Sequence, residues 1–157
     1  MSGKIIVLFL ALAAAGTAAA GYYLQVYAFY HEVAPAGPLD VQATAIGATT
    51  PEPLPHTQFQ AIDARSSPIR YRACFRTALP LARALATYQP YAGAEPLIAP
   101  PWFECFDARR LTTDLREGRA KAFLGQREIA RGVDRVLVLY GDGRGFVWHQ
   151  LNGTFQP

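Results

Sequence analysis

From residue 5 to residue 30 the chain contains no Asp, Glu, Lys, Arg or His side chain. A helix over residues 5–24 would span roughly 30 Å, the thickness of the hydrocarbon layer of a membrane. Aromatic residues, whose amphipathic rings favour the membrane–water boundary, gather at the C-terminal end of this run: Tyr22, Tyr23, Tyr27, Phe29 and Tyr30. The sequence therefore predicts an N-terminal transmembrane anchor within residues 1–30, in contact with a lipid bilayer.

Lys4 is the charged side chain at the other end of this run. Because positively charged ends stay in the cytoplasm, we expect a cytoplasmic N-terminus and residues 31–157 on the far side of the membrane. A cleaved secretory signal is the alternative, since the apolar residues 5–15 are followed by the small residues 18–20. We favour a retained anchor, because a belt of tyrosines has no use in a peptide that is discarded.

Small residues recur along the anchor at helical spacing, and such stripes let two helix backbones approach closely in lipid. They are Ala13, Gly16, Thr17, Ala20 and Gly21. The pattern favours packing against the transmembrane helix of a partner. The plainer interpretation is that alanine is abundant throughout this chain.

Residues 31–55 are rich in proline, which prevents helix formation and favours stiff, extended backbone. The prolines are Pro35, Pro38, Pro51, Pro53 and Pro55. We predict three parts: an anchor (1–30), a proline-rich tether with one short strand near 39–46 (31–55), and a folded domain (56–157).

The domain alternates between strand and helix patterns. Residues 136–139 are apolar without alternation, which predicts a central strand covered on both faces. Asp142 and Gly143 supply the turn of a hairpin. The predicted strands are 57–63, 69–75, 120–124, 133–140 and 145–151, and the predicted helices are 78–88, capped by Thr77, and 108–117, capped by Asp107. The fold class is α+β: a mainly antiparallel sheet of about five strands with two short helices.

Cys74 and Cys105 would lie in an oxidising compartment, where an even pair of cysteines favours a disulfide. Closing this loop would stabilise the fold by roughly 3–4 kcal/mol. Two buried free thiols are the alternative, and the spacing does not match a redox or haem motif.

Alternation along residues 69–76 places three arginines, Arg70, Arg72 and Arg76, on the same strand face as Cys74. The opposite, aromatic face is expected to be core. The arginine row is a candidate docking surface for an anion or a partner. The plainer interpretation is a solvated face whose arginines pair locally with acidic residues near Cys105.

Composition excludes several classes of protein. The chain is 51% hydrophobic and 17% charged, which excludes intrinsic disorder. Its 15 basic and 12 acidic residues are too nearly balanced for a nucleic-acid-binding surface. His31, His56 and His149 are scattered, and we find no metal, cofactor or nucleophile motif. We therefore assign no catalytic, cofactor-binding or metal-binding residue and no cofactor.

Several short segments resemble a family of small, single-anchor proteins of unknown function from alphaproteobacteria. They are residues 59–64 (FQAIDA), 67–75 (SPIRYRACF), 102–107 (WFECFD), 142–146 (DGRGF) and 148–150 (WHQ). The resemblance implies an inner-membrane protein of a Gram-negative cell with a periplasmic domain. It implies no known activity.

Three functional hypotheses follow. The first is a non-catalytic accessory or assembly subunit of a larger inner-membrane complex, with a respiratory complex as one candidate. The second is a membrane-anchored ligand-binding or sensing module in the periplasm that uses the arginine row as an anion site. The third is an enzyme whose cleft would gather His149 with acidic residues.

Overall fold

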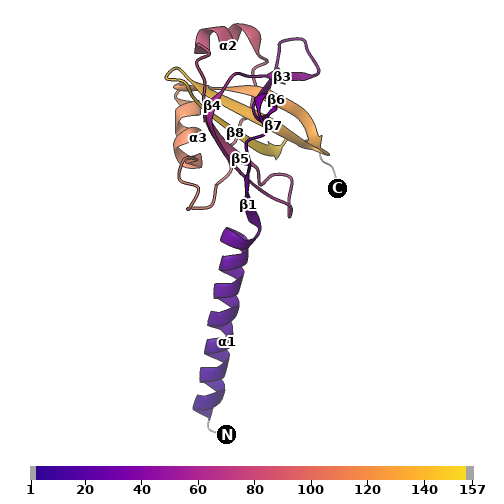
Figure 1. Ribbon diagram of the computed structural model, residues 1–157. Helices are drawn as coiled ribbons and strands as arrows, with labels where there is room; N and C mark the ends of the chain where they lie inside the picture. Colours follow the sequence, from indigo (N-terminus) through magenta and orange to yellow (C-terminus); the bar gives the residue numbers. More distant parts are fainter. Residues whose placement is uncertain (1–2, 155–157) are drawn as a thin grey trace.

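The computed structural model describes residues 3–154, so the outermost residues of the predicted anchor (1–2) and domain (155–157) lie outside the described residues. Helix α1 (Gly3–Tyr23) projects away from the globular part of the molecule, and none of its residues is buried (Figure 1). It continues into a short π-helical turn, η1 (Leu24–Ala28). The helical stretch Gly3–Ala28 is long and apolar enough to cross a membrane, as the uncharged run predicts.

The globular part is built on a six-stranded antiparallel sheet of order β1-β4-β5-β8-β7-β6. Its strands are β1 (Tyr30–Val33), β4 (Thr57–Ala64), β5 (Arg72–Arg76), β6 (Ala120–Ala130), β7 (Val133–Tyr140) and β8 (Arg144–Leu151). A small ribbon of β2 (Gln42–Thr44) and β3 (Pro51–Pro53), the 3-10 turn η2 (Pro38–Asp40) and helices α2 (Leu81–Thr87) and α3 (Ala108–Arg116) surround it. The predicted α+β class is confirmed.

Both faces of the sheet are covered, and β7 shows why its sequence does not alternate. Leu137 and Leu139 belong to one core, which the ribbon and α2 complete. Val136 and Val138 belong to a second core on the other face, which α3 and the preceding loop complete. A strand that is apolar on both sides must be central, and β7 lies between β6 and β8 as expected.

The proline-rich segment 31–55 is not a free tether. Its first residues form β1, which pairs with β4 at the edge of the sheet. Val41, Ala43 and Leu54 are fully buried in the first core, and the Thr44 hydroxyl donates a hydrogen bond to the Gly125 carbonyl at 2.9 Å. Proline prevents helix formation but does not prevent extended backbone from packing, so this segment covers one face of the sheet.

The two helices differ in how well local sequence predicts them. Helix α3 begins after Asp107, whose carboxylate accepts a hydrogen bond from the backbone N–H of Arg110 at 3.0 Å, as predicted. Helix α2 is shorter than predicted and is preceded by Pro80, not Thr77. The Thr77 hydroxyl instead donates to the Pro55 carbonyl at 2.7 Å, a contact with a distant segment that local sequence does not reveal.

The hairpin between β7 and β8 has the predicted turn. Gly143 has φ of 83°, and the Asp142 carboxylate accepts a hydrogen bond from the Arg144 N–H at 3.0 Å. Gly145 faces the ring of Phe75 so closely that a Cβ there would overlap the ring. The hairpin is therefore fixed against β5, which positions the residues described below.

Candidate functional site: an arginine-lined cleft

A disulfide joins Cys74 to Cys105, with a Cα–Cα distance of 6.3 Å, as predicted. It connects β5 to the loop that precedes α3 and holds this loop across the second face of the sheet. Tyr71, Ala73 and Phe75 lie in the first core and Cys74 in the second, so the alternation predicted for this strand is confirmed. The arginine face is therefore largely covered by protein.

Arg72 is buried, with 3% of its surface exposed. Its guanidinium donates hydrogen bonds to the backbone carbonyls of Ile69, Tyr71, Leu97 and Ile98 at 2.7–3.2 Å. Burial lowers its pKa to about 10, so it stays charged at neutral pH. Arg72 is thus a structural clamp between β5 and residues 97–98, not a docking residue.

The other two arginines of the predicted row lie at different places. Arg70 contacts the end of the anchor, where it donates a hydrogen bond to the Gln25 side chain at 3.2 Å. Arg76 donates to the carbonyl of Asp142 in the hairpin at 3.2 Å. The three arginines therefore do not form one surface: Arg70 contacts the anchor, Arg72 is buried in the interior, and Arg76 contacts the hairpin.

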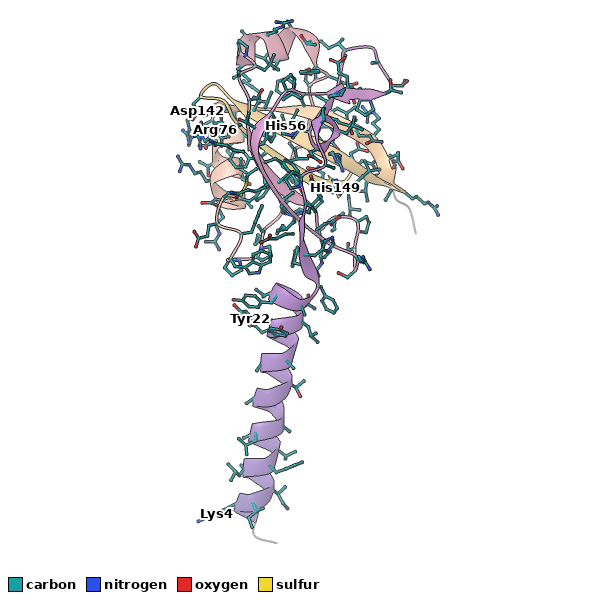
Figure 2. The ribbon with its side chains drawn as sticks, viewed as in Figure 1. Lys4, Tyr22, His56, Arg76, Asp142 and His149 are labelled. Carbon is teal, nitrogen blue, oxygen red and sulfur yellow. A yellow bond between two sulfur atoms is a disulfide. The ribbon has the colours of Figure 1, made fainter. Side chains whose placement is uncertain are left out.

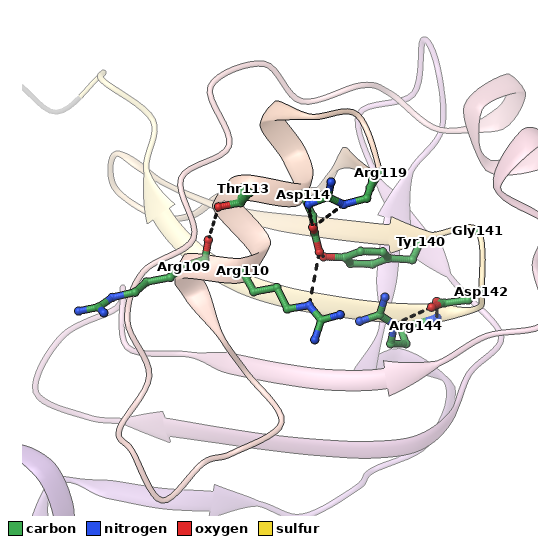
Figure 3. A pocket seen from close by; sticks show the side chains of 9 residues that line it. All are labelled: Arg109, Arg110, Thr113, Asp114, Arg119, Tyr140, Gly141, Asp142 and Arg144. Atoms are coloured by element: carbon green, nitrogen blue, oxygen red, sulfur yellow. Dashed lines mark hydrogen bonds and ion pairs between the residues drawn. The ribbon is translucent and has the colours of Figure 1, made fainter.

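The arginines that do gather in space come from α3, from the loop that follows it, and from the hairpin. They line an open cleft of about 730 Å³, shown in Figure 3. The lining residues are Arg109, Arg110, Thr113, Asp114, Arg119, Tyr140, Gly141, Asp142 and Arg144. Figure 2 shows Asp142 on the part of the domain remote from α1.

Asp114 is the buried centre of this cleft. Its carboxylate accepts hydrogen bonds from the Tyr140 hydroxyl at 2.6 Å and from Arg119 Nε at 2.8 Å, while Arg110 Nε lies 3.8 Å away. The Tyr140 hydroxyl and the Arg119 guanidinium lower the pKa of Asp114, so the carboxylate remains ionised.

Tyr140 and Arg144, from the β7–β8 hairpin, form the wall of the cleft opposite α3 (Figure 3). The Arg144 guanidinium lies 4.2 Å from the centre of the Tyr140 ring, and its Nε donates to the Asp142 carboxylate at 2.8 Å. Burial, together with the bond to Asp114, raises the pKa of Tyr140. Neither Tyr140 nor Asp114 therefore changes protonation near neutral pH.

The chemistry that this arrangement offers is anion recognition. The lining contains four arginines and two aspartates, and guanidinium groups bind carboxylates and phosphates through paired N–H donors. No sequence pattern predicts this site. The available signals were the neighbouring Arg109 and Arg110 at the start of a capped helix, but nothing local indicates that α3 packs beside the β7–β8 turn.

A sequence profile of a protein family matches residues 41–156. The chain belongs to a family of unknown function, DUF6446. The DUF6446 match includes the β2–β3 ribbon, both helices that cover the sheet and every residue of the cleft, whereas α1 precedes it. No curated protein and no solved structure matches the chain.

His149, the histidine weighed as a catalytic candidate, lies in β8 within the DUF6446 region and is buried. Its Nδ1 is 2.8 Å from the Pro68 carbonyl and its Nε2 accepts a hydrogen bond from Arg135 Nε at 3.0 Å. Burial lowers its pKa to about 3, so the ring is neutral. Among residues 3–154, no group of three or more His, Cys, Asp or Glu side chains could hold a metal ion.

Proposed function

We propose that this protein is a non-catalytic accessory or assembly subunit of a larger membrane complex. The observation that carries the proposal is the joint between anchor and domain. Strand β1 starts at Tyr30, one residue after the end of η1, and its first residue already pairs with β4. Because no flexible linker separates α1 from the sheet, a partner that binds α1 would also fix the position of the domain.

Side-chain contacts reinforce the joint from two loops. The Trp102 indole donates a hydrogen bond to the Val26 carbonyl at 2.7 Å. Arg70 reaches the Gln25 side chain, and its guanidinium lies 5.5 Å from the centre of the Tyr30 ring. Small residues in α1, among them Gly16 and Ala20, suit close packing against a partner helix.

For location, we infer the inner membrane of a Gram-negative bacterium, with the N-terminus in the cytoplasm and the domain in the periplasm. Lys4 supports this orientation through the positive-inside tendency. The disulfide supports an oxidising compartment. The resemblance to single-anchor alphaproteobacterial proteins supports the membrane, and respiratory complexes are among the candidate partners.

Purification of the tagged full chain from its own membranes in a mild detergent tests the proposal. We expect it to elute with defined membrane proteins in a complex. Replacing Gly16 and Ala20 with leucine should release it, whereas the same change at Ala11 and Ala15, on the opposite face of α1, should not. A wild-type chain that emerges alone and monomeric would refute the proposal.

The arginine-lined cleft favours a second candidate function, a membrane-anchored module that binds an anionic ligand. Thermal unfolding of the full chain in detergent, with inorganic phosphate or citrate as probes, tests it. We expect the probes to raise the melting temperature, and this shift should disappear when Arg110 and Arg144 are both replaced by alanine. Arg83→Ala, an exposed change on α2, is the control and should keep the shift.

A further inference from the structure

We propose that the base of the domain is itself a membrane-contact surface, with Ile98 inserted at the boundary of the bilayer. This base consists of residues 97–102 and the turn 65–70. Both loops extend toward α1 on either side of the joint (Figure 1). The inference requires α1 to lie in lipid, and it does not depend on any protein partner.

Specific contacts place these loops beside the end of the anchor. On one side, Trp102 donates its hydrogen bond to Val26 and its ring meets that of Tyr30 edge to face, with centroids 6.2 Å apart. On the other side, Arg65 and Ser66 line a small hollow together with residues 28–31. Both loops of the domain therefore lie directly against the joint.

The depth of the anchor fixes the depth of these loops. Val26 follows the last residue of α1 by three positions, which corresponds to roughly 5 Å of helix. The headgroup layer adds about 5–7 Å beyond each edge of the hydrocarbon. With Tyr22 and Tyr23 at that edge, Trp102 lies at headgroup depth, where indole rings are favoured.

Ile98 is the most exposed large hydrophobic residue among those described, with 74% of its surface accessible. Its backbone is not loose, because Arg72 binds the carbonyls of both Leu97 and Ile98. A rigid loop that holds an isoleucine side chain in water forgoes the free energy that burying this side chain would gain. Lipid supplies that burial, and two basic residues lie at the joint: Arg65 beside residues 28–31 and Arg70 beside Gln25.

Ile46 provides a matched control within the same chain. It is also an exposed isoleucine, at 59%. Its backbone N–H bonds to the Thr87 carbonyl at the end of α2, which lies at the end of the domain opposite α1 (Figure 1). Ile46 and Ile98 therefore differ in their distance from the anchor and share the same side-chain chemistry.

Methyl NMR of the full chain in nanodiscs of phosphatidylethanolamine and phosphatidylglycerol tests the proposal. Isoleucine δ1 methyl groups are labelled, and Ile98→Leu assigns the Ile98 signal by its disappearance. A phospholipid with a nitroxide high on its acyl chain is then added, and a soluble gadolinium chelate is added to a separate sample.

We expect the lipid nitroxide to remove most of the Ile98 methyl signal and leave the Ile46 signal intact. We expect the gadolinium chelate to broaden the Ile46 signal and leave the Ile98 signal intact. If the chelate broadens both methyl groups equally, Ile98 is in water and the proposal is wrong. If Ile98 is protected from both agents, a protein surface covers it, and the proposal is equally wrong. Neither result would bear on the copurification experiment.

Discussion

Arg72 holds the start of β5 and residues 97–98 together through four backbone carbonyls. Each carbonyl would lose this donor if the side chain were removed. The four bonds are buried or part-buried, and acceptors left unsatisfied there are costly. Arg76, on the same strand, is exposed and makes one bond to the Asp142 carbonyl. Two arginines that look alike in the sequence therefore have different energetic roles.

We predict that Arg72→Met lowers the free energy of unfolding by roughly 3 kcal/mol or more. Arg76→Met should change it by less than about 1 kcal/mol, since exposed polar contacts contribute little. Urea unfolding of the full chain in detergent, followed by the fluorescence of the buried Trp148, measures both. Equal effects at the two positions would contradict the structural role assigned to Arg72.

His149 makes stability depend on pH. In the folded state burial keeps its pKa near 3, whereas an unfolded imidazole takes up a proton near 6.5. Below pH 6.5 the unfolded state therefore binds more protons than the folded state. The free energy of unfolding should fall toward acid pH by up to about 1.4 kcal/mol per pH unit.

We expect this decline between pH 6.5 and 5, before the carboxylates of Asp114, Glu128 and Asp142, whose pKa values are also lowered, begin to contribute. His149→Gln should flatten the slope in that window, whatever it does to stability at pH 7. Urea titrations at half-unit pH intervals give the slope. An unchanged slope in the variant would show that another group is responsible.

At the level of elements, the disulfide and α3 act together. Cys105 stands two residues before Asp107, the residue that caps α3, and Cys74 lies in the middle of β5. The bond therefore holds the first turn of α3 against the sheet. It also fixes Arg109 and Arg110, at the start of α3, relative to Arg144 in β8.

Replacing both cysteines with alanine should lower the free energy of unfolding by roughly 3–4 kcal/mol, because the bond closes a loop with a sequence separation of 31 residues. Thermal unfolding in detergent measures the loss. A reducing agent should have the same effect on the wild-type chain and no effect on the double variant. If the reducing agent lowered the melting temperature of both proteins, the loss of stability would not come from the Cys74–Cys105 bond.

At the scale of the whole molecule, contacts at the joint hold α1 and the domain together. The backbone passes from η1 to β1 across the single residue Phe29. Trp102 and Arg70 bind carbonyl or amide groups of the last helical turn. We therefore expect a rotation of α1 about its axis to turn the domain as well.

We predict that a Gly-Ser-Gly insertion between Ala28 and Phe29 uncouples the two parts without unfolding either. Limited proteolysis in detergent should cut the inserted variant at the joint and leave the wild type uncut there, because a flexible backbone is accessible to proteases. The melting temperature of the domain should stay the same in both. Equal cleavage of the wild type would show that the joint is already mobile.

Much of this architecture follows from local patterns. The uncharged run predicts α1, the unalternated residues of β7 predict a central strand, Asp107 predicts the start of α3, and the two cysteines predict their bond. Each of the first three depends on a short segment, and the disulfide depends on a chain that contains two cysteines. Such properties depend on periodicity, capping and composition, which are visible without knowing what lies nearby.

Other features depend on contacts between segments that are distant in the chain. The proline-rich segment 31–55 covers a core because Val41 and Leu54 meet the sheet, although prolines alone predict an extended tether. The arginine cleft forms because α3 and the β7–β8 turn are neighbours, and the predicted arginine row divides because Arg72 is covered by residues 97–98. The sequence by itself determined α1, α3 and most strands of the sheet, because these depend on local patterns. Tertiary packing decided that β1 and the β2–β3 ribbon form from the proline-rich segment, which charged side chains are buried and which face solvent together.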